Sequence, residues 1–154
     1  MPSDAAIDTL ETLPGHLIRR LQQIAVGIFL DEVADQAVTP VQFALLHTAQ
    51  AMPGMDQRSI AAAIGFDTST IGAVVDRLEK RGLIARQMSA EDKRVRRLHV
   101  TAAGEALLAG AVPAMLRAQR RMLVPLNAAE QASFLEMLTR VVTANAEWSR
   151  AAKD

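Results

Sequence analysis

Basic side chains gather in one short stretch of this 154-residue chain. The stretch SAEDKRVRRLHVTAAG, residues 89–104, holds five of them within seven positions: Lys93, Arg94, Arg96, Arg97 and the titratable His99. Residues 77–97 contain eight basic and three acidic side chains, whereas the whole chain has 17 of each sign. A basic patch on an otherwise acidic protein indicates a polyanion that binds at one place. A solvated charged face is the structural alternative, and a run of charge alone favours it.

Hydroxyl side chains form a second group with binding chemistry. Thr68, Ser69 and Thr70 stand where a helix is predicted to begin, and there they can bond to phosphates and base edges. Gly72 and Ala73 follow one turn later and lack bulk, so the backbone can approach a ligand closely. For any one of the hydroxyls, a helix-capping role is the alternative.

The elements that must position these groups follow from hydrophobic periodicity. Apolar residues at helical spacing predict a first helix over about residues 16–35, and Thr39-Pro40 marks the start of a second. A short helix then stops at Gly65, and a longer one follows up to Gly82. Two helices joined by a glycine-containing turn predict a helix-turn-helix, whose second helix reads DNA.

Two strand-like segments follow the helix-turn-helix. LIARQM is compatible with a strand, and RRLHVT alternates, with Leu98 and Val100 on one face and Arg97 and His99 on the other. The cationic loop SAEDKRV joins the two segments. Together they predict a wing, with the basic cluster at a hairpin tip beside the reading helix.

The C-terminal part is predicted to be helical. Thr101 caps one long helix, and Asn127 with Glu130 forms a capping box for the last one. The outer helices carry more apolar positions than a winged-helix core of this size needs, and Phe134 and Trp148 are not expected to face water. The expected fold class is mainly α with a small β-hairpin wing (α+β), in a homodimer.

The reading helix and the wing divide the expected DNA contacts. Arg94 is expected to enter the minor groove of an A·T-rich segment, with Asp92 holding its guanidinium in position. The predicted DNA-binding set is Arg58, Thr68, Ser69, Thr70, Gly72, Arg77, Lys80, Lys93, Arg94, Arg96 and Arg97.

The run DKRVRRLHVTAAG resembles the wing signature of MarR-family transcription regulators through Asp92, Arg94, Leu98, Thr101 and Gly104. TSTIGAVVDRLEKRGLIAR resembles the recognition helix and first wing strand of that family, and the likeness covers nearly the whole chain. It implies one MarR-like domain over 1–154, with a winged helix-turn-helix lobe at 39–100 and dimerisation helices at 16–36 and 102–150. Many members carry a larger polar or basic residue where this chain has Gly72 and Ala73, which shifts the expected base contacts to Thr68–Thr70, Arg77 and the wing.

A polar stripe on the first helix suggests a ligand site. His16, Arg19, Arg20 and Gln23 fall at spacings of i, i+3, i+4 and i+7, and arginine suits a carboxylate. Arg86 is expected to converge on this stripe, and Phe43 to supply an apolar wall. A solvated or inter-subunit face is the alternative. Within the family, the chain looks most like regulators of nicotinate-type or other aromatic-acid catabolism.

These features predict a homodimeric regulator of transcription, a repressor that binds a pseudo-palindromic operator and is released by a small aromatic acid. The alternative is a winged-helix dimer that acts through protein partners without specific DNA binding. No nucleophile elbow, phosphate loop or metal-ligand spacing occurs, and there is no cysteine, so neither an enzyme nor a cofactor or metal is expected. The N-terminus lacks signal-peptide character and no apolar run would span a bilayer, so a cytoplasmic location without membrane contact is expected.

Overall fold

The computed structural model describes residues 9–149 of the chain. The ends of the predicted domain at 1–154, and residue 150 of the predicted dimerisation helices, lie outside this described part. The helices are α1 (Pro14–Glu32), α2 (Pro40–Ala51), α3 (Gln57–Ala63), α4 (Thr68–Lys80), α5 (Ala102–Leu123) and α6 (Ala128–Ala144). Two strands, β1 (Ile84–Met88) and β2 (Arg96–Val100), and three short 3-10 turns, η1 (Leu10–Thr12), η2 (Ala34–Gln36) and η3 (Ala146–Trp148), complete the order. The predicted fold class, mainly α with a small hairpin, is confirmed.

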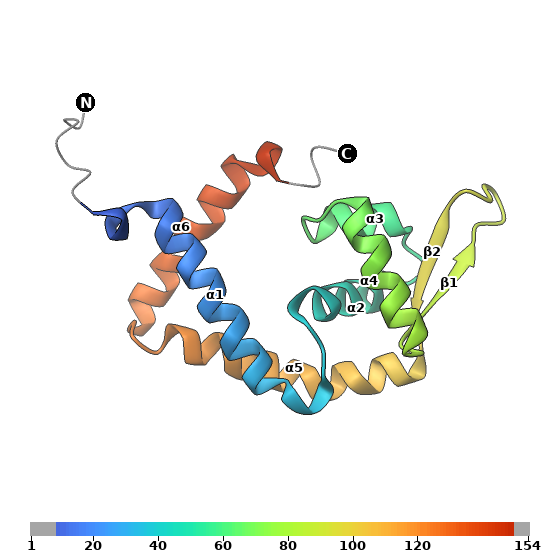
Figure 1. Ribbon diagram of the computed structural model, residues 1–154, viewed down its shortest axis with the longest axis horizontal. Helices are drawn as coiled ribbons and strands as arrows, with labels where there is room; N and C mark the ends of the chain where they lie inside the picture. Colours follow the sequence, from blue (N-terminus) through green and yellow to red (C-terminus); the bar gives the residue numbers. More distant parts are fainter. Residues whose placement is uncertain (1–8, 150–154) are drawn as a thin grey trace.

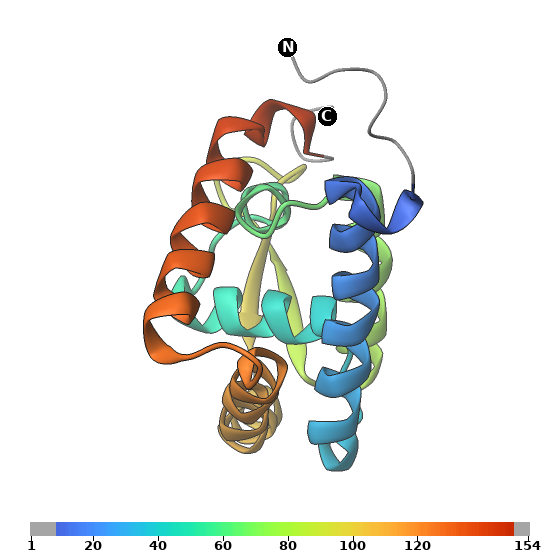
Figure 2. The same ribbon diagram turned by 90° about the vertical axis from the view of Figure 1, so that its left-hand side faces the viewer.

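The long helix α5 links the two ends of the molecule (Figure 1). Helices α2, α3 and α4 and the hairpin lie above its first half, while α1 and α6 flank its second half. Turned by 90°, the view shows α1 and α6 as separate rods at its right and left, with α2 and α3 behind them (Figure 2). Within the described residues, no helix is both long enough and apolar enough to cross a membrane.

Short polar side chains begin the helices at the predicted positions. Thr39 and Gln42 form a capping box on α2, Thr101 Oγ1 accepts a hydrogen bond from the Gly104 amide, and Asn127 and Glu130 form a second box on α6. The first helix differs at both ends from the prediction: Pro14 takes its first position, and it stops at Glu32 before a 3-10 turn. Proline suits a first position because the missing amide would have no helical partner there.

Positive-φ glycines make the tight turns of the helix-turn-helix. Gly65, with φ of 76°, follows α3, and Gly82, with φ of 71°, follows α4. Glycine adopts this left-handed backbone without the steric penalty of a Cβ. The two turns fix where α4 begins and ends, and so where its side chains point.

The hairpin is antiparallel, with Ile84 opposite Val100 and Met88 opposite Arg96. The other edge of β2 pairs with the chain that leads into α3, because the Gly54 amide donates to Leu98 O and the Leu98 amide donates to Met55 O, each at 3.0 Å. The wing is therefore bonded to the start of the helix-turn-helix as well as following its end.

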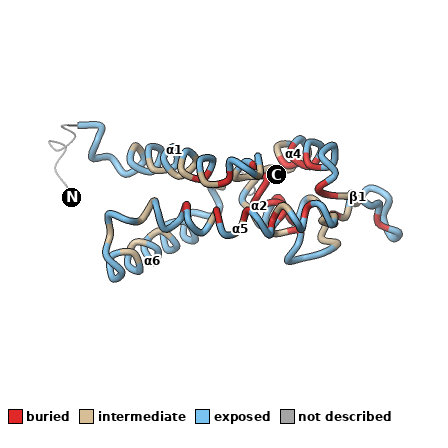
Figure 3. Tube along the Cα trace, turned by 90° about the horizontal axis from the view of Figure 1, so that it is seen from below, coloured by how far each residue is buried: buried red, intermediate tan, exposed pale blue. Residues whose placement is uncertain are grey.

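The core lies in the lobe formed by α2, α3, α4 and the hairpin, closed by the first half of α5 (Figure 3). Its fully buried side chains include Leu45, Leu46, Ile60, Ile71, Leu78, Ile84, Leu98 and Leu108. Among residues 9–149, helix α6 contributes no buried residue. The predicted apolar face of α6 is instead open, with Leu135, Val141 and Val142 more than half exposed and Trp148 72% exposed.

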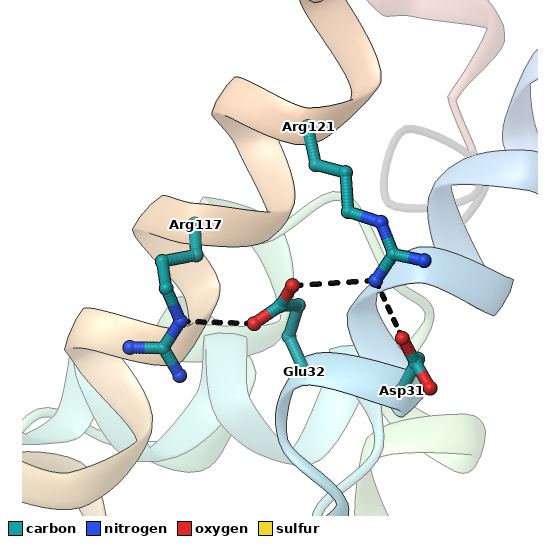
Figure 4. A network of polar contacts seen from close by, with 4 residues as sticks. All are labelled: Asp31, Glu32, Arg117 and Arg121. Atoms are coloured by element: carbon teal, nitrogen blue, oxygen red, sulfur yellow. Dashed lines mark hydrogen bonds and ion pairs between the residues drawn. The ribbon is translucent and has the colours of Figure 1, made fainter.

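An ion-pair network joins the end of α1 to α5 (Figure 4). Glu32 accepts hydrogen bonds from Arg117 at 2.9 Å and from Arg121 at 3.3 Å, and Arg121 also bonds to Asp31. The Arg117 hydrogen bond, helped by Arg121, holds the pKa of the Glu32 carboxyl below its usual value. The network fixes the direction in which α1 leaves the lobe.

Candidate nucleic-acid interface

Asp67 caps the first turn of helix α4. One carboxylate oxygen of Asp67 accepts a hydrogen bond from the Thr70 amide at 2.7 Å, and the other accepts one from the Thr70 hydroxyl at 2.8 Å. Asp67 is therefore the N-cap of α4, and the capping role left open for Thr68 or Ser69 is not theirs. The Thr70 hydroxyl therefore already donates within the chain, whereas Ser69 is exposed at the leading end of the helix.

The outer face of α4 carries its polar side chains in successive turns. Ser69, Asp76, Arg77, Glu79 and Lys80 are exposed, together with the small residue Ala73, while Ile71, Val74, Val75 and Leu78 are buried against the lobe. This division gives a helix with one face free to enter a groove of DNA and the opposite face held by the core.

The tip of the wing holds Arg94 in the open. Its side chain is 94% exposed, and its Nε lies 3.6 Å from Asp92 Oδ1. Asp92 also shapes the backbone of the tip, because the same oxygen accepts a hydrogen bond from the Arg94 amide at 2.9 Å. Lys93 is exposed beside it, and Arg96 donates to Lys93 O at 2.6 Å.

A cationic cleft lies between the wing and the helix-turn-helix. It has a volume of about 390 Å³ and is lined by Asp56, Gln57, Arg58, Thr68, Arg86, Arg94, Val95 and Arg96. Four of these eight residues are arginines, drawn from α3, β1, the wing loop and β2. Guanidinium groups that converge in one cleft bind phosphate oxygens well, since each presents paired donors.

Arg86 belongs to this cleft, and the expectation that it converges on the first-helix stripe is wrong within this chain. Its guanidinium forms an ion pair with Asp76 of α4, and its Nε lies 3.5 Å from Glu79 Oε2. The side chain is only 22% exposed. This partner could not be predicted from the sequence, because a strand residue and a helix residue ten positions away meet only through the fold.

Arg97 ties the wing to the lobe. Its guanidinium donates to Gly54 O at 3.0 Å and approaches Glu91 at 3.5 Å, and its backbone pairs with Asp56 in an isolated bridge. A phosphate contact from Arg97 thus competes with a hydrogen bond that holds the wing to the lobe.

Asp56 supports the cleft from the start of α3. Its carboxylate accepts hydrogen bonds from the Ser59 hydroxyl at 2.6 Å and the Ser59 amide at 2.9 Å. The hydroxyl bond, followed by backbone amide bonds, lowers the pKa of Asp56 below its usual value even though partial burial opposes the shift. The side chain therefore stays ionised and keeps capping α3 well below neutral pH.

The proposed ligand stripe lies on α1, away from this cleft. Arg19, Arg20 and Gln23 are exposed, and His16 lies 3.4 Å from Arg19 between Nδ1 and Nη2. Phe43 is buried in the core, with its ring edge-on to Phe29 and stacked on His47. The structure brings His16 and Arg19 together but joins neither Phe43 nor Arg86 to them. Among residues 9–149, no group of His, Asp or Glu side chains could hold a metal ion.

Comparison with known proteins identifies this architecture. The family model described as MarR family matches residues 38–95, which span the helix-turn-helix and most of the wing. The transcriptional regulator HosA of Escherichia coli O157:H7 is 31% identical over 134 residues, covering 87% of this chain and 98% of HosA.

Solved structures agree over nearly the full length. PcaV, a transcriptional regulator of Streptomyces coelicolor in complex with its natural ligand, has a TM-score of 0.83 and 38% identity, covering 88% of this chain and 96% of PcaV. The transcriptional repressor CouR, bound to a 23-mer DNA duplex, has a TM-score of 0.82 and 33% identity, covering 91% of this chain and 99% of CouR. BpsR of Bordetella bronchiseptica, whose DNA binding is regulated by 6-hydroxynicotinic acid, has a TM-score of 0.82 and 27% identity over 86% of this chain and 95% of BpsR. With its recognition helix, its basic wing and these relatives, the chain belongs to the MarR family of transcriptional regulators.

Proposed function

We propose that this protein is a cytoplasmic homodimeric repressor that binds a pseudo-palindromic operator and leaves it when a small aromatic carboxylate binds. The observation that carries the DNA-binding part is the cationic cleft, in which four arginines flank the exposed face of α4. Residues 39–100 read the DNA, and residues 16–36 and 102–150 pair the two subunits. CouR supports the repressor role, since it is a repressor with DNA bound.

The open face of α6 supports the dimer. A helix with no buried residue in the described part of the chain is not stabilised by packing there. Its exposed Leu135, Val141 and Val142 favour contact with a partner surface. Leu17, Ile18 and Ile24 of α1 are similarly exposed. A two-fold dimer puts the recognition helices about one turn of DNA apart, ~34 Å, which requires two related half-sites.

Val142→Glu tests the dimer by light scattering after size exclusion. It should give monomers, because a charge would be buried at the contact, whereas Gln50→Glu on the exposed surface of α2 should leave dimers. If both variants form assemblies of equal mass in solution, the subunit contact lies elsewhere.

DNA binding is tested on the duplex upstream of the protein's own gene, with a scrambled duplex of equal length and composition as the control. We expect the wild-type protein to prefer the upstream duplex, with affinity falling steeply as salt rises because several phosphates are neutralised. A flat salt response, or equal affinity for the two duplexes, contradicts the proposal and favours action through protein partners.

The effector part rests on the polar stripe of α1. His16, Arg19, Arg20 and Gln23 supply cationic and hydrogen-bonding groups on one helix next to an apolar surface, which suits a carboxylate on an aromatic ring. BpsR supports this ligand class.

Release of bound operator is measured against a panel of 6-hydroxynicotinate and hydroxybenzoates, with the matching neutral amides as controls. The acids should release DNA and the amides should not, and Arg20→Gln should raise the acid concentration required. A panel without effect removes this class of effector.

A further inference from the structure

The side chain of Gln57 lies over the recognition helix at Gly72. A Cβ added at Gly72 would lie 3.6 Å from Gln57 Nε2, which is the one close neighbour from outside its own stretch of helix among the described residues. Gln57 is the first residue of α3, so this amide comes from the helix before the recognition helix. Where a larger residue at 72 would project its own side chain, this chain has an amide supplied by α3.

Gly72 is the middle residue of a row, Thr68, Gly72 and Asp76, on one side of α4 beside the cleft. Thr68, four residues before it, lines the cleft directly. Asp76, four residues after it, pairs with Arg86, another lining residue. Residues four apart lie on the same side of a helix, so Gly72 opens the middle of this row, and Gln57, which also lines the cleft, occupies the opening.

The side-chain oxygen Oε1 of Gln57 is buried and has no hydrogen-bond partner among residues 9–149. Buried polar groups in native proteins are nearly always paired, so this oxygen calls for a partner such as an ordered water or a bound ligand. The terminal torsion of glutamine is soft, and the missing Cβ at Gly72 leaves room for the amide to turn its oxygen toward the cleft.

We propose that Gln57 reads an adenine in each half-site of the operator, taking the part that a side chain at position 72 would otherwise have. An amide presents one acceptor and two donors in a plane, the pattern that matches N6 and N7 of adenine in the major groove. The arginines around it match phosphates instead, and they hold the duplex against the cleft. This inference rests on the proposed DNA-binding function and adds the base that is read and the residue that reads it.

The test selects preferred duplexes from a random pool with the wild-type protein and with Gln57→Ala, and then measures affinities for single-base variants of the selected site. The wild-type protein should prefer adenine at one symmetric position by roughly 5- to 150-fold, the range for one bidentate base contact. Gln57→Ala should reduce that preference to about onefold while preferences at all other positions persist. Gln50→Ala, an exposed glutamine of α2 outside the cleft, serves as the matched control and should select the wild-type site.

Two variants at position 72 change the space beside the amide and leave Gln57 itself unaltered. Gly72→Ala places only a methyl group in ordinary contact with Gln57, so the adenine preference should persist, whereas Gly72→Leu should displace the amide and lose the same preference as Gln57→Ala. Circular dichroism verifies that both variants fold.

The outcomes separate the inference from the function on which it rests. A wild-type protein that selects no site overturns both. If the wild-type protein selects a site and Gln57→Ala selects the same site, only the role of Gln57 is overturned. The same holds if Gln57→Ala binds the site more weakly by an equal factor for every base at that position.

Discussion

The guanidinium of Arg86 on β1 is ion-paired with the carboxylate of Asp76 on α4. This contact joins the first strand of the wing to the middle of the recognition helix, at the edge of the cleft that Arg86 itself lines. It orients the wing relative to α4, and it neutralises part of the positive charge that Arg86 would otherwise offer to a phosphate.

Replacing Asp76 by Asn should therefore strengthen non-specific DNA binding. Asp76 is 58% exposed, so the free energy of unfolding should change by less than about 1 kcal/mol. The released charge of Arg86 should steepen the slope of log affinity against log salt by up to about 0.9, the value for one more neutralised phosphate. Fluorescence anisotropy with a random-sequence duplex at several salt concentrations measures both quantities.

Asp35→Asn removes the same charge from η2, outside the cleft, and should leave the slope unchanged. Weaker binding of Asp76→Asn to every duplex would instead show that Asp76 contacts DNA itself.

Asp67→Ala should destabilise the lobe through the start of α4. The substitution leaves the Thr70 amide without its acceptor and frees the Thr70 hydroxyl, a loss of about 0.5–2 kcal/mol for an N-cap. Urea unfolding measures the change in free energy, and Asp67→Asn is the control because asparagine caps equally well. Equal losses for both variants would assign the effect to the negative charge and not to the cap.

The features that the sequence predicted are those decided locally. Thr39, Thr101 and Asn127 cap helices through residues three positions away, and Gly82 ends α4 through its own backbone angle, so a short window contains the cause. The hairpin followed for the same reason, from alternation on either side of a polar loop.

The features that were missed depend on distant parts of the fold. Arg86 was expected to face the polar stripe of α1, yet its neighbours are carboxylates of α4 that only the folded lobe brings near. Arg97 belongs to the predicted DNA-binding set, although Gly54, 43 residues away, accepts a hydrogen bond from it. Gln57 gave no signal at all, because its position over Gly72 results from the packing of α3 on α4.

Gly104→Ala should destabilise the protein severely, because α5 begins in close contact with the base of the wing. A Cβ at position 104 would lie 2.2 Å from Leu83 O and 2.6 Å from Val100 Cγ1. Backbone cannot yield as a flexible side chain can, so the free energy of unfolding should fall by about 1–3 kcal/mol or more. Gly110→Ala, later in the same helix, meets only the end of the Gln36 side chain and should change stability by less than about 1 kcal/mol. Chemical denaturation compares them, and similar values for the two variants would contradict this close packing.

Asp56 should make the lobe sensitive to acid. Its pKa is lowered in the folded state by the Ser59 hydrogen bonds, so its stabilisation is complete above the unfolded pKa near 4 and is lost as the pH falls through the lower folded value. Asp56→Asn retains a cap but does not titrate. The difference in free energy of unfolding between this variant and the wild type should therefore change between about pH 5 and pH 2. Urea unfolding across that range measures the difference, and two parallel curves would show that Asp56 does not contribute.

Arg94 and Arg97 carry the same charge three residues apart, but their surroundings predict opposite phenotypes. Arg94 is 94% exposed and bonds only to the tip of its own loop, so Arg94→Ala should leave stability within about 0.5 kcal/mol. It should nevertheless weaken DNA binding and reduce the salt slope by about 1, as expected when one cation that displaces counterions from the duplex is lost. Arg97→Ala removes the hydrogen bond to Gly54 O and should cost about 1–2 kcal/mol of stability.

Lysine substitutions separate charge from geometry at these two positions. Arg94→Lys should recover most of the salt slope, because an ammonium group also neutralises a phosphate. Arg97→Lys should recover little stability, since one point donor on a shorter stem does not reproduce a guanidinium that reaches both Gly54 O and Glu91. Anisotropy titrations and urea unfolding of the four variants decide the matter. If Arg94→Ala unfolds more easily than Arg97→Ala, the division between a DNA-facing wing tip and a structural wing base is wrong.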